Sequence, residues 1–109
     1  MKKVITGNWK KFFDYRFISG EDLLDKDATL TIKEIGIDEA FNGKTKEDVV
    51  CVSFEETDKM LVLNRTNAKH LTLMFGTPSV DNWIGNKITL TCQTVQAFGQ
   101  SVLAVRIKD

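Results

Sequence analysis

The side chains most able to do chemistry are few and lie far apart in the sequence. His70 is the only histidine, so any nucleophile that needs a histidine base would depend wholly on it. It stands beside Lys69 in a helical pattern, which is typical of a solvated surface histidine. Neither Cys51 nor Cys92 has a partner at metal-ligand spacing, and both lie in strand-like runs. We interpret them as buried, reduced thiols that act as small apolar residues, with a disulfide between neighbouring strands as the alternative.

One acidic turn is the remaining candidate for a reactive or metal-binding site. Glu55, Glu56 and Asp58 could hold a small cation through oxygen ligands, although three acidic residues in a turn usually form only a solvated loop. The sequence has no P-loop, no dinucleotide-binding glycine pattern and no zinc-binding spacing. We therefore predict that the protein is not an enzyme and needs no cofactor or metal.

Five strand-like runs and one helical run must position any functional side chain. Strands are predicted over residues 28–37, 49–55, 60–63, 87–95 and 102–107, with a helix over residues 66–75. A helix between the third and fourth of five strands is typical of the small Greek-key barrel that binds oligonucleotides and oligosaccharides, the OB-fold. We expect a mainly β protein built as one five-stranded OB-like barrel.

Local patterns add detail to three of these elements. In the first strand the apolar residues stand at even-numbered positions up to Ile32 and at odd-numbered positions from Ile35. This change predicts a β-bulge near Lys33 and Glu34. In the second strand the alternation places residues 50, 52 and 54 inward and residues 51 and 53 outward. The helix should carry an apolar stripe, begin at a capping side chain and end before a left-handed glycine. These residues are Ala68, Leu71, Met74 and Phe75 for the stripe, Asn64 or Thr66 for the cap, and Gly76.

Length and charge limit the choice of function. The chain of 109 residues, with 42% hydrophobic and 28% charged residues, is expected to form one domain. We expect residues 1–24, rich in aromatic side chains, to form a lid over one end of the barrel. Zero net charge argues against the overall basic field of a duplex-binding protein. The charge is uneven, however, since residues 14–58 carry 13 acidic and 5 basic side chains.

A single-strand binding site is the best-supported candidate. Such sites combine a cationic groove with aromatic faces on which bases stack. In an OB-fold the groove lies over the second and third strands and is edged by two loops, here residues 38–48 and 97–100. Phe41 and Phe98 lie in these loops; the alternative is that both rings fold back over the barrel ends. The candidate cations are Lys33, Lys44, Lys87 and Arg106.

Parts of the second half of the chain resemble a group of small phage-encoded proteins that are mostly uncharacterised. The resemblance is carried by residues 61–69 (LVLNRTNAK), 83–90 (WIGNKITL), 98–99 (FG) and 104–107 (AVRI), with a weaker match at residues 28–33. It implies a phage or prophage origin and brings no catalytic residues with it.

We therefore predict a non-enzymatic phage protein that binds single-stranded nucleic acid during replication or recombination. The alternative is a protein-interaction module that binds or inhibits a host factor, which the zero net charge and the acidic middle segment favour. A third possibility is a homo-oligomer formed by pairing exposed strands. The sequence has no apolar run long enough for a secretory leader or a membrane span, so we expect a cytoplasmic protein, in the host cytoplasm if phage-encoded.

Overall fold

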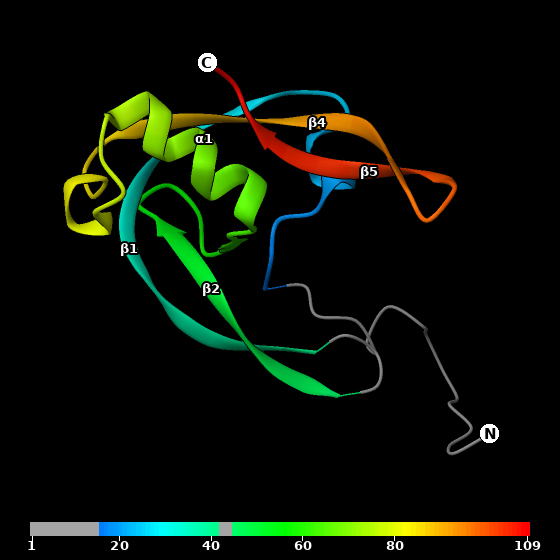
Figure 1. Cartoon of the computed structure of the whole chain (residues 1–109), viewed down its shortest axis with the longest axis horizontal. Helices are drawn as coiled ribbons and strands as arrows, with labels where there is room; N and C mark the ends of the chain where they lie inside the picture. The colour runs from blue at the N-terminus through cyan, green and yellow to red at the C-terminus, as the bar shows by residue number, and fades with distance from the viewer. Residues whose placement is uncertain (1–15, 42–44) are drawn as a thin grey trace.

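The computed structural model describes residues 16–41 and 45–109, with the backbone alone described for Phe41. The helical elements are the 3-10 helices η2 (Gly20–Leu23) and η3 (Val80–Asn82) and the α-helix α1 (Arg65–Phe75). The strands are β1 (Ala28–Phe41), β2 (Lys46–Phe54), β3 (Leu61–Val62), β4 (Lys87–Ala97) and β5 (Gln100–Ile107). Figure 1 shows α1 on one side of the strands, with two long hairpins extending beyond it.

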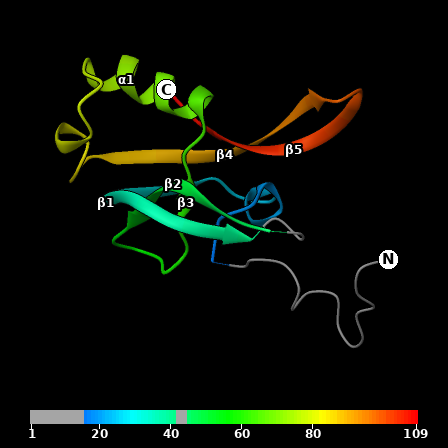
Figure 2. The same ribbon diagram turned by 60° about the horizontal axis from the view of Figure 1, so that its bottom comes forward.

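The described strands form one antiparallel sheet in the order β3-β2-β1-β4-β5. The prediction of a mainly β protein with a helix between the third and fourth strands is confirmed. The sheet is open, because β3 and β5 are its two edges and do not pair in the part of the chain that the structure describes. Figure 2 shows α1 above β4 and β5, with β1, β2 and β3 below them.

Residues 16–23 occupy the space between the two edge strands. The backbone N–H of Ile18 donates to the carbonyl of Met60 next to β3, and the N–H of Met60 donates to the carbonyl of Arg16, both at 2.8 Å. Farther along, a Cβ at Gly20 would lie 2.7 Å from Cβ of Leu103 in β5, so glycine is needed for this close approach. The segment therefore contacts both edges where a closed barrel would pair them directly.

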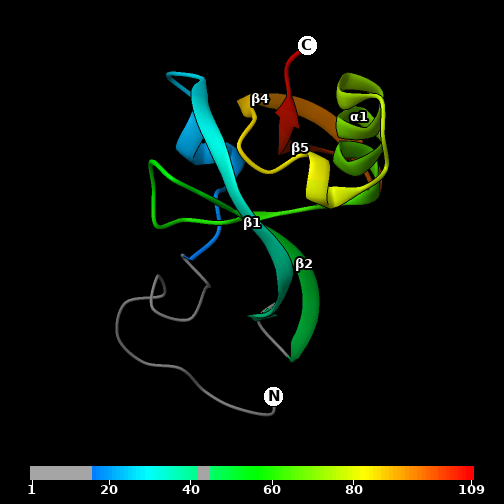
Figure 3. The same cartoon turned by 90° about the vertical axis from the view of Figure 1, so that its left-hand side faces the viewer.

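The predicted bulge in β1 is present. The pairing between β1 and β2 shifts register between Ile32 and Glu34, which bends a strand of 14 residues. Both hairpins are longer than predicted, because β1 and β2 pair out to Phe41 and Lys46, and β4 and β5 pair out to the turn at residues 98–99. Figure 3 shows the β1–β2 hairpin running away from the rest of the strands.

The predicted alternation of β2 is present, but the exposure of two residues does not follow from it. Val50, expected inside, is 38% exposed because it lies beyond the end of the core. Cys51, expected outside, is 4% exposed although it lies on the face opposite Val52. Met60 approaches this face and lines a hollow together with Cys51. Both faces of β2 are thus covered near its middle.

Helix α1 begins and ends where the sequence predicts, and one of its side chains is hydrogen-bonded to the edge strand β5. Asn64 Oδ1 accepts a hydrogen bond from the N–H of Asn67 at 2.8 Å, and Gly76 ends the helix at φ 70°. Leu71 is completely buried beneath the helix. The buried Asn67 side chain donates to the carbonyl of Val105 at 3.0 Å. Because β5 is an edge strand, this bond satisfies a carbonyl that no neighbouring strand reaches.

Candidate nucleic-acid interface

The structure places three of the six predicted binding residues on the β4–β5 hairpin. Lys87 is the first residue of β4, Arg106 is the penultimate residue of β5, and Phe98 lies in the turn between the two strands. Lys33 is exposed at the bulge of β1. Two residues cannot be placed in the site, since Lys44 lies outside the described residues and only the backbone of Phe41, the last residue of β1, is described.

Phe98 is held in an unusual position at the tip of the β4–β5 hairpin. Ala97 and Gln100 pair directly, so Phe98 and Gly99 alone make the turn. Both have positive φ, 52° and 75°, which a type I′ hairpin turn requires and which asparagine and glycine normally supply. The Phe98 side chain is fully exposed. The ring is therefore presented to solvent despite the cost of its backbone conformation and of its apolar surface.

The outer face of the sheet next to this hairpin is rich in hydroxyl groups and contains two cations. Register places Lys87 opposite Thr31 and Arg106 opposite Thr91. Thr89 lies between Lys87 and Thr91 on the same face, because alternate residues of a strand point the same way. From Lys87 to Lys108 the sequence contains no acidic residue. This face offers hydrogen-bond donors and positive charge with no carboxylate from β4 or β5.

Two carboxylates from neighbouring segments border this face, and both are engaged. Asp27 lies 3.0 Å from the Lys108 ammonium. A hydrogen bond from the Thr91 hydroxyl, together with Lys108, holds the pKa of Asp27 below its usual value. At the other end, Glu56 accepts hydrogen bonds from Thr31. Both carboxylates stay ionised at neutral pH and weaken the positive potential of the face.

The contact between Glu56 and Thr31 makes stability depend on pH. The N–H and the hydroxyl of Thr31 each donate to Glu56 at 2.7 Å and hold the pKa of this carboxyl below its ordinary 4.5. Because the pKa is lower in the folded state, the stabilisation is complete above about pH 4.5 and is lost as the pH falls through the folded-state pKa. We expect the urea midpoint of Glu56→Gln to fall less on acidification than that of the wild type. Glu55→Gln, a change at the neighbouring exposed residue, should keep the wild-type acid sensitivity; equal behaviour of the two variants would contradict this assignment.

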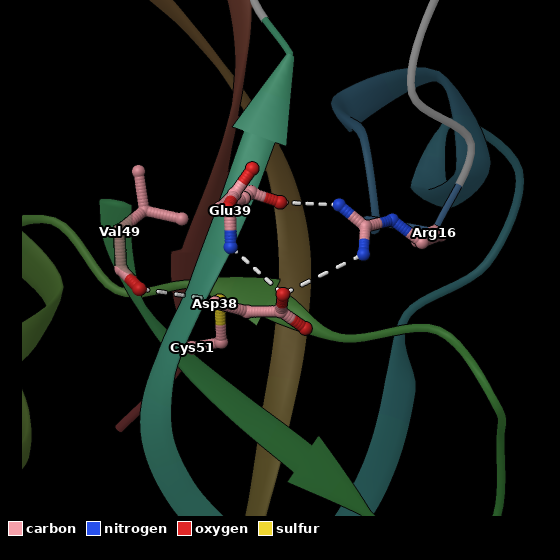
Figure 4. Close-up of polar contacts among 5 residues, drawn as sticks. All are labelled: Arg16, Asp38, Glu39, Val49 and Cys51. Carbon is pink, nitrogen blue, oxygen red and sulfur yellow. Dashed lines mark hydrogen bonds and ion pairs between the residues drawn. The ribbon is translucent and has the colours of Figure 1, made fainter. Parts of the chain in front are cut away.

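The sequence predicts a cationic groove over the second and third strands, but the hollow in this part of the molecule is acidic. This hollow of about 240 Å³ lies instead over β1 and β2 and is lined by Glu34, Gly36, Ile37, Asp38, Cys51, Ser53 and Met60, of which only Met60 adjoins β3. Arg16 stands beside it, pairs with Asp38 at 3.6 Å and donates to the carbonyl of Glu39 (Figure 4). None of the four predicted binding residues whose side chains are described, Lys33, Lys87, Phe98 and Arg106, lines this hollow. Its two acidic residues make it a poor track for phosphate.

Two features of these surfaces were not predicted from the sequence. One is the pairing of Thr29 with Thr89, whose hydroxyl oxygens lie 2.9 Å apart on the outer face, together with the neighbouring Thr31 and Thr91. The alternation of threonine along both strands is a signal that could have suggested it. The other is Arg16, which no local pattern connects to the β1–β2 hairpin.

The residues considered for catalysis or metal binding lie elsewhere. His70 Nε2 is 2.8 Å from the Asp109 carboxylate, and the imidazole is partly exposed. Cys51 is buried, as interpreted from the sequence, whereas Cys92 is half-buried, and the two cysteines form no disulfide with each other. Within residues 16–41 and 45–109, no three histidine, cysteine or acidic side chains gather closely enough to hold a metal ion.

Comparisons with other proteins do not add a function to this geometry. None of the described helices has the length and apolar character needed to cross a membrane. No protein-family model matches the chain, and neither a curated protein nor a solved structure shows significant similarity to it.

Proposed function

We propose that this protein binds single-stranded nucleic acid along its β4–β5 hairpin, with Phe98 as a stacking platform. The observation that carries the proposal is the fully exposed phenylalanine at φ 52° in a two-residue turn. A turn selected only for stability would carry asparagine or glycine there. Single-strand binders present aromatic faces in this way, because every base has a face on which to stack.

The proposed fold is an OB-like barrel that is partly open. Strand β1 pairs with both β2 and β4, and the order β3-β2-β1-β4-β5 would close into a barrel if β3 met β5. The turn that carries Phe98 corresponds to the loop between the fourth and fifth strands, one of the two loops that edge the binding groove in OB-folds. This correspondence supports the hairpin as the binding element.

Electrostatics suggest modest affinity with little sequence preference. Lys87 and Arg106 can neutralise phosphates, and the threonine hydroxyls between them can donate hydrogen bonds. The β1–β2 hairpin carries several carboxylates that would repel a phosphate backbone: Glu34, Asp38, Glu39, Glu47 and Asp48. We therefore infer that the bound nucleic-acid strand runs along β4 and β5 and avoids β1 and β2. The proposed role remains the handling of single strands in phage replication or recombination.

The test of this proposal is the salt dependence of binding to a labelled oligothymidine, followed by fluorescence anisotropy. Removal of one cation that neutralises a phosphate should reduce the log–log salt slope by roughly 0.7 for a single strand. We expect Lys87→Gln and Arg106→Gln each to weaken binding and flatten this slope. Lys69→Gln, a change at an exposed lysine of α1, serves as the matched control and should bind like the wild type. No binding at tens of micromolar protein in low salt would reject the proposal and favour the protein-interaction alternative.

A further inference from the structure

The core-facing side of the β1–β2 hairpin continues beyond the hydrophobic core. Ile35 pairs with Val52, which is completely buried. The next pair on the same face is Ile37 with Val50, which are 68% and 38% exposed. Two large apolar side chains thus lie directly opposite each other on an uncovered part of the sheet.

Two carboxylates follow this apolar pair on the same face. Glu39 pairs directly with Asp48, one step farther toward the turn, and both residues are exposed. Like charges directly opposite each other destabilise a sheet. No ion pair within the described ranges engages either carboxylate, whereas Asp38 on the other face is paired with Arg16. Among the described residues, the pair therefore keeps its mutual repulsion, which an added cation would relieve.

We propose that these four residues, Ile37, Val50, Glu39 and Asp48, form a docking face for a basic, extended segment of a partner protein. An apolar side chain of the segment would cover Ile37 and Val50. A lysine or arginine two residues farther along would lie between Glu39 and Asp48, because alternate residues of both extended chains advance by about 7 Å. Charge complementarity selects this occupant and excludes a nucleic acid, whose phosphates the two carboxylates would repel.

This inference does not depend on the proposed nucleic-acid site, because it uses the other hairpin. The probe is a labelled peptide that repeats valine, threonine, lysine and threonine, so that valine and lysine alternate along one face. A control peptide has glutamate in place of lysine. We expect saturable, salt-sensitive binding of the lysine peptide in fluorescence anisotropy and none of the glutamate peptide.

Variants of the docking face provide the decisive comparison. Glu39→Gln combined with Asp48→Asn should weaken peptide binding about 2- to 30-fold, the range for two partly exposed ion pairs. Removing the repulsive pair should leave the thermal midpoint unchanged or higher, so loss of binding would not reflect unfolding. Ile37→Ser should also weaken binding, and Leu73→Ser, a change at an exposed leucine of α1, should not.

Three results would overturn the proposal. The first is absence of saturable binding to the lysine peptide, and the second is equal affinity of the double variant and the wild type. The third comes from sedimentation without peptide: a mass above the monomer that falls in the double variant would assign the face to a second copy of this chain.

Discussion

The Phe98→Asn variant is expected to unfold at a higher temperature and to lose affinity for single-stranded nucleic acid. A bulky residue at positive φ costs on the order of 1–3 kcal/mol, and asparagine followed by glycine is the preferred sequence of this turn. Phe98 is fully exposed, so replacing its ring removes no buried apolar contact. We expect about 1 kcal/mol of stabilisation, which raises the thermal midpoint by about 4–8 °C in a domain of this size.

Affinity should change in the opposite direction. Loss of one stacked base costs roughly 1–3 kcal/mol, which corresponds to about 5- to 150-fold weaker binding to oligothymidine. Phe98→Trp is the matched control, because it keeps an aromatic face and the same strained backbone. It should retain binding and the wild-type thermal midpoint. If Phe98→Asn binds as tightly as the wild type, the exposed ring has no part in binding.

The Leu71→Ala variant is expected to show the largest loss of stability. Leu71 is completely buried between α1 and the sheet, and truncation of such a leucine costs about 2–5 kcal/mol. Because α1 also holds β5 through Asn67 and Val105, loosening the helix should disturb the base of the β4–β5 hairpin. Urea denaturation followed by circular dichroism measures the free energy of unfolding.

Leu73→Ala on the same helix is the control for this prediction. Leu73 is 83% exposed, so the same chemical change should alter the free energy of unfolding by no more than about 0.5 kcal/mol. A large loss of stability in Leu73→Ala, comparable with that in Leu71→Ala, would mean that the outer face of α1 is covered in solution.

The parts of the fold that local patterns encode could be predicted. The change of parity at Ile35 located the bulge, since a strand cannot otherwise turn both Ile32 and Ile35 toward one core. Asn64, one of the two capping candidates, and Gly76 marked the ends of α1, because each has a specific role at a helix terminus. The turn at residues 97–100 was also located from the sequence.

The parts that depend on long-range contacts could not be predicted. Both hairpins extend past the core, where exposed polar residues replace the apolar alternation that marks a strand. Cys51 is buried beside Met60, which its own alternation cannot reveal. The open sheet reflects the insertion of residues 16–23 between β3 and β5. Whether Phe98 is exposed depends on the length of its hairpin, and the sequence alone left that open.

The most direct test of the nucleic-acid interface is a map of backbone amide chemical shifts as oligothymidine is added to the isotope-labelled protein. We expect the shifts to concentrate at the Phe98 turn and along the outer face of β4 and β5, near Lys87 and Arg106. Shifts that concentrate instead on the β1–β2 hairpin, or no shifts at saturating oligonucleotide, would contradict the proposed interface.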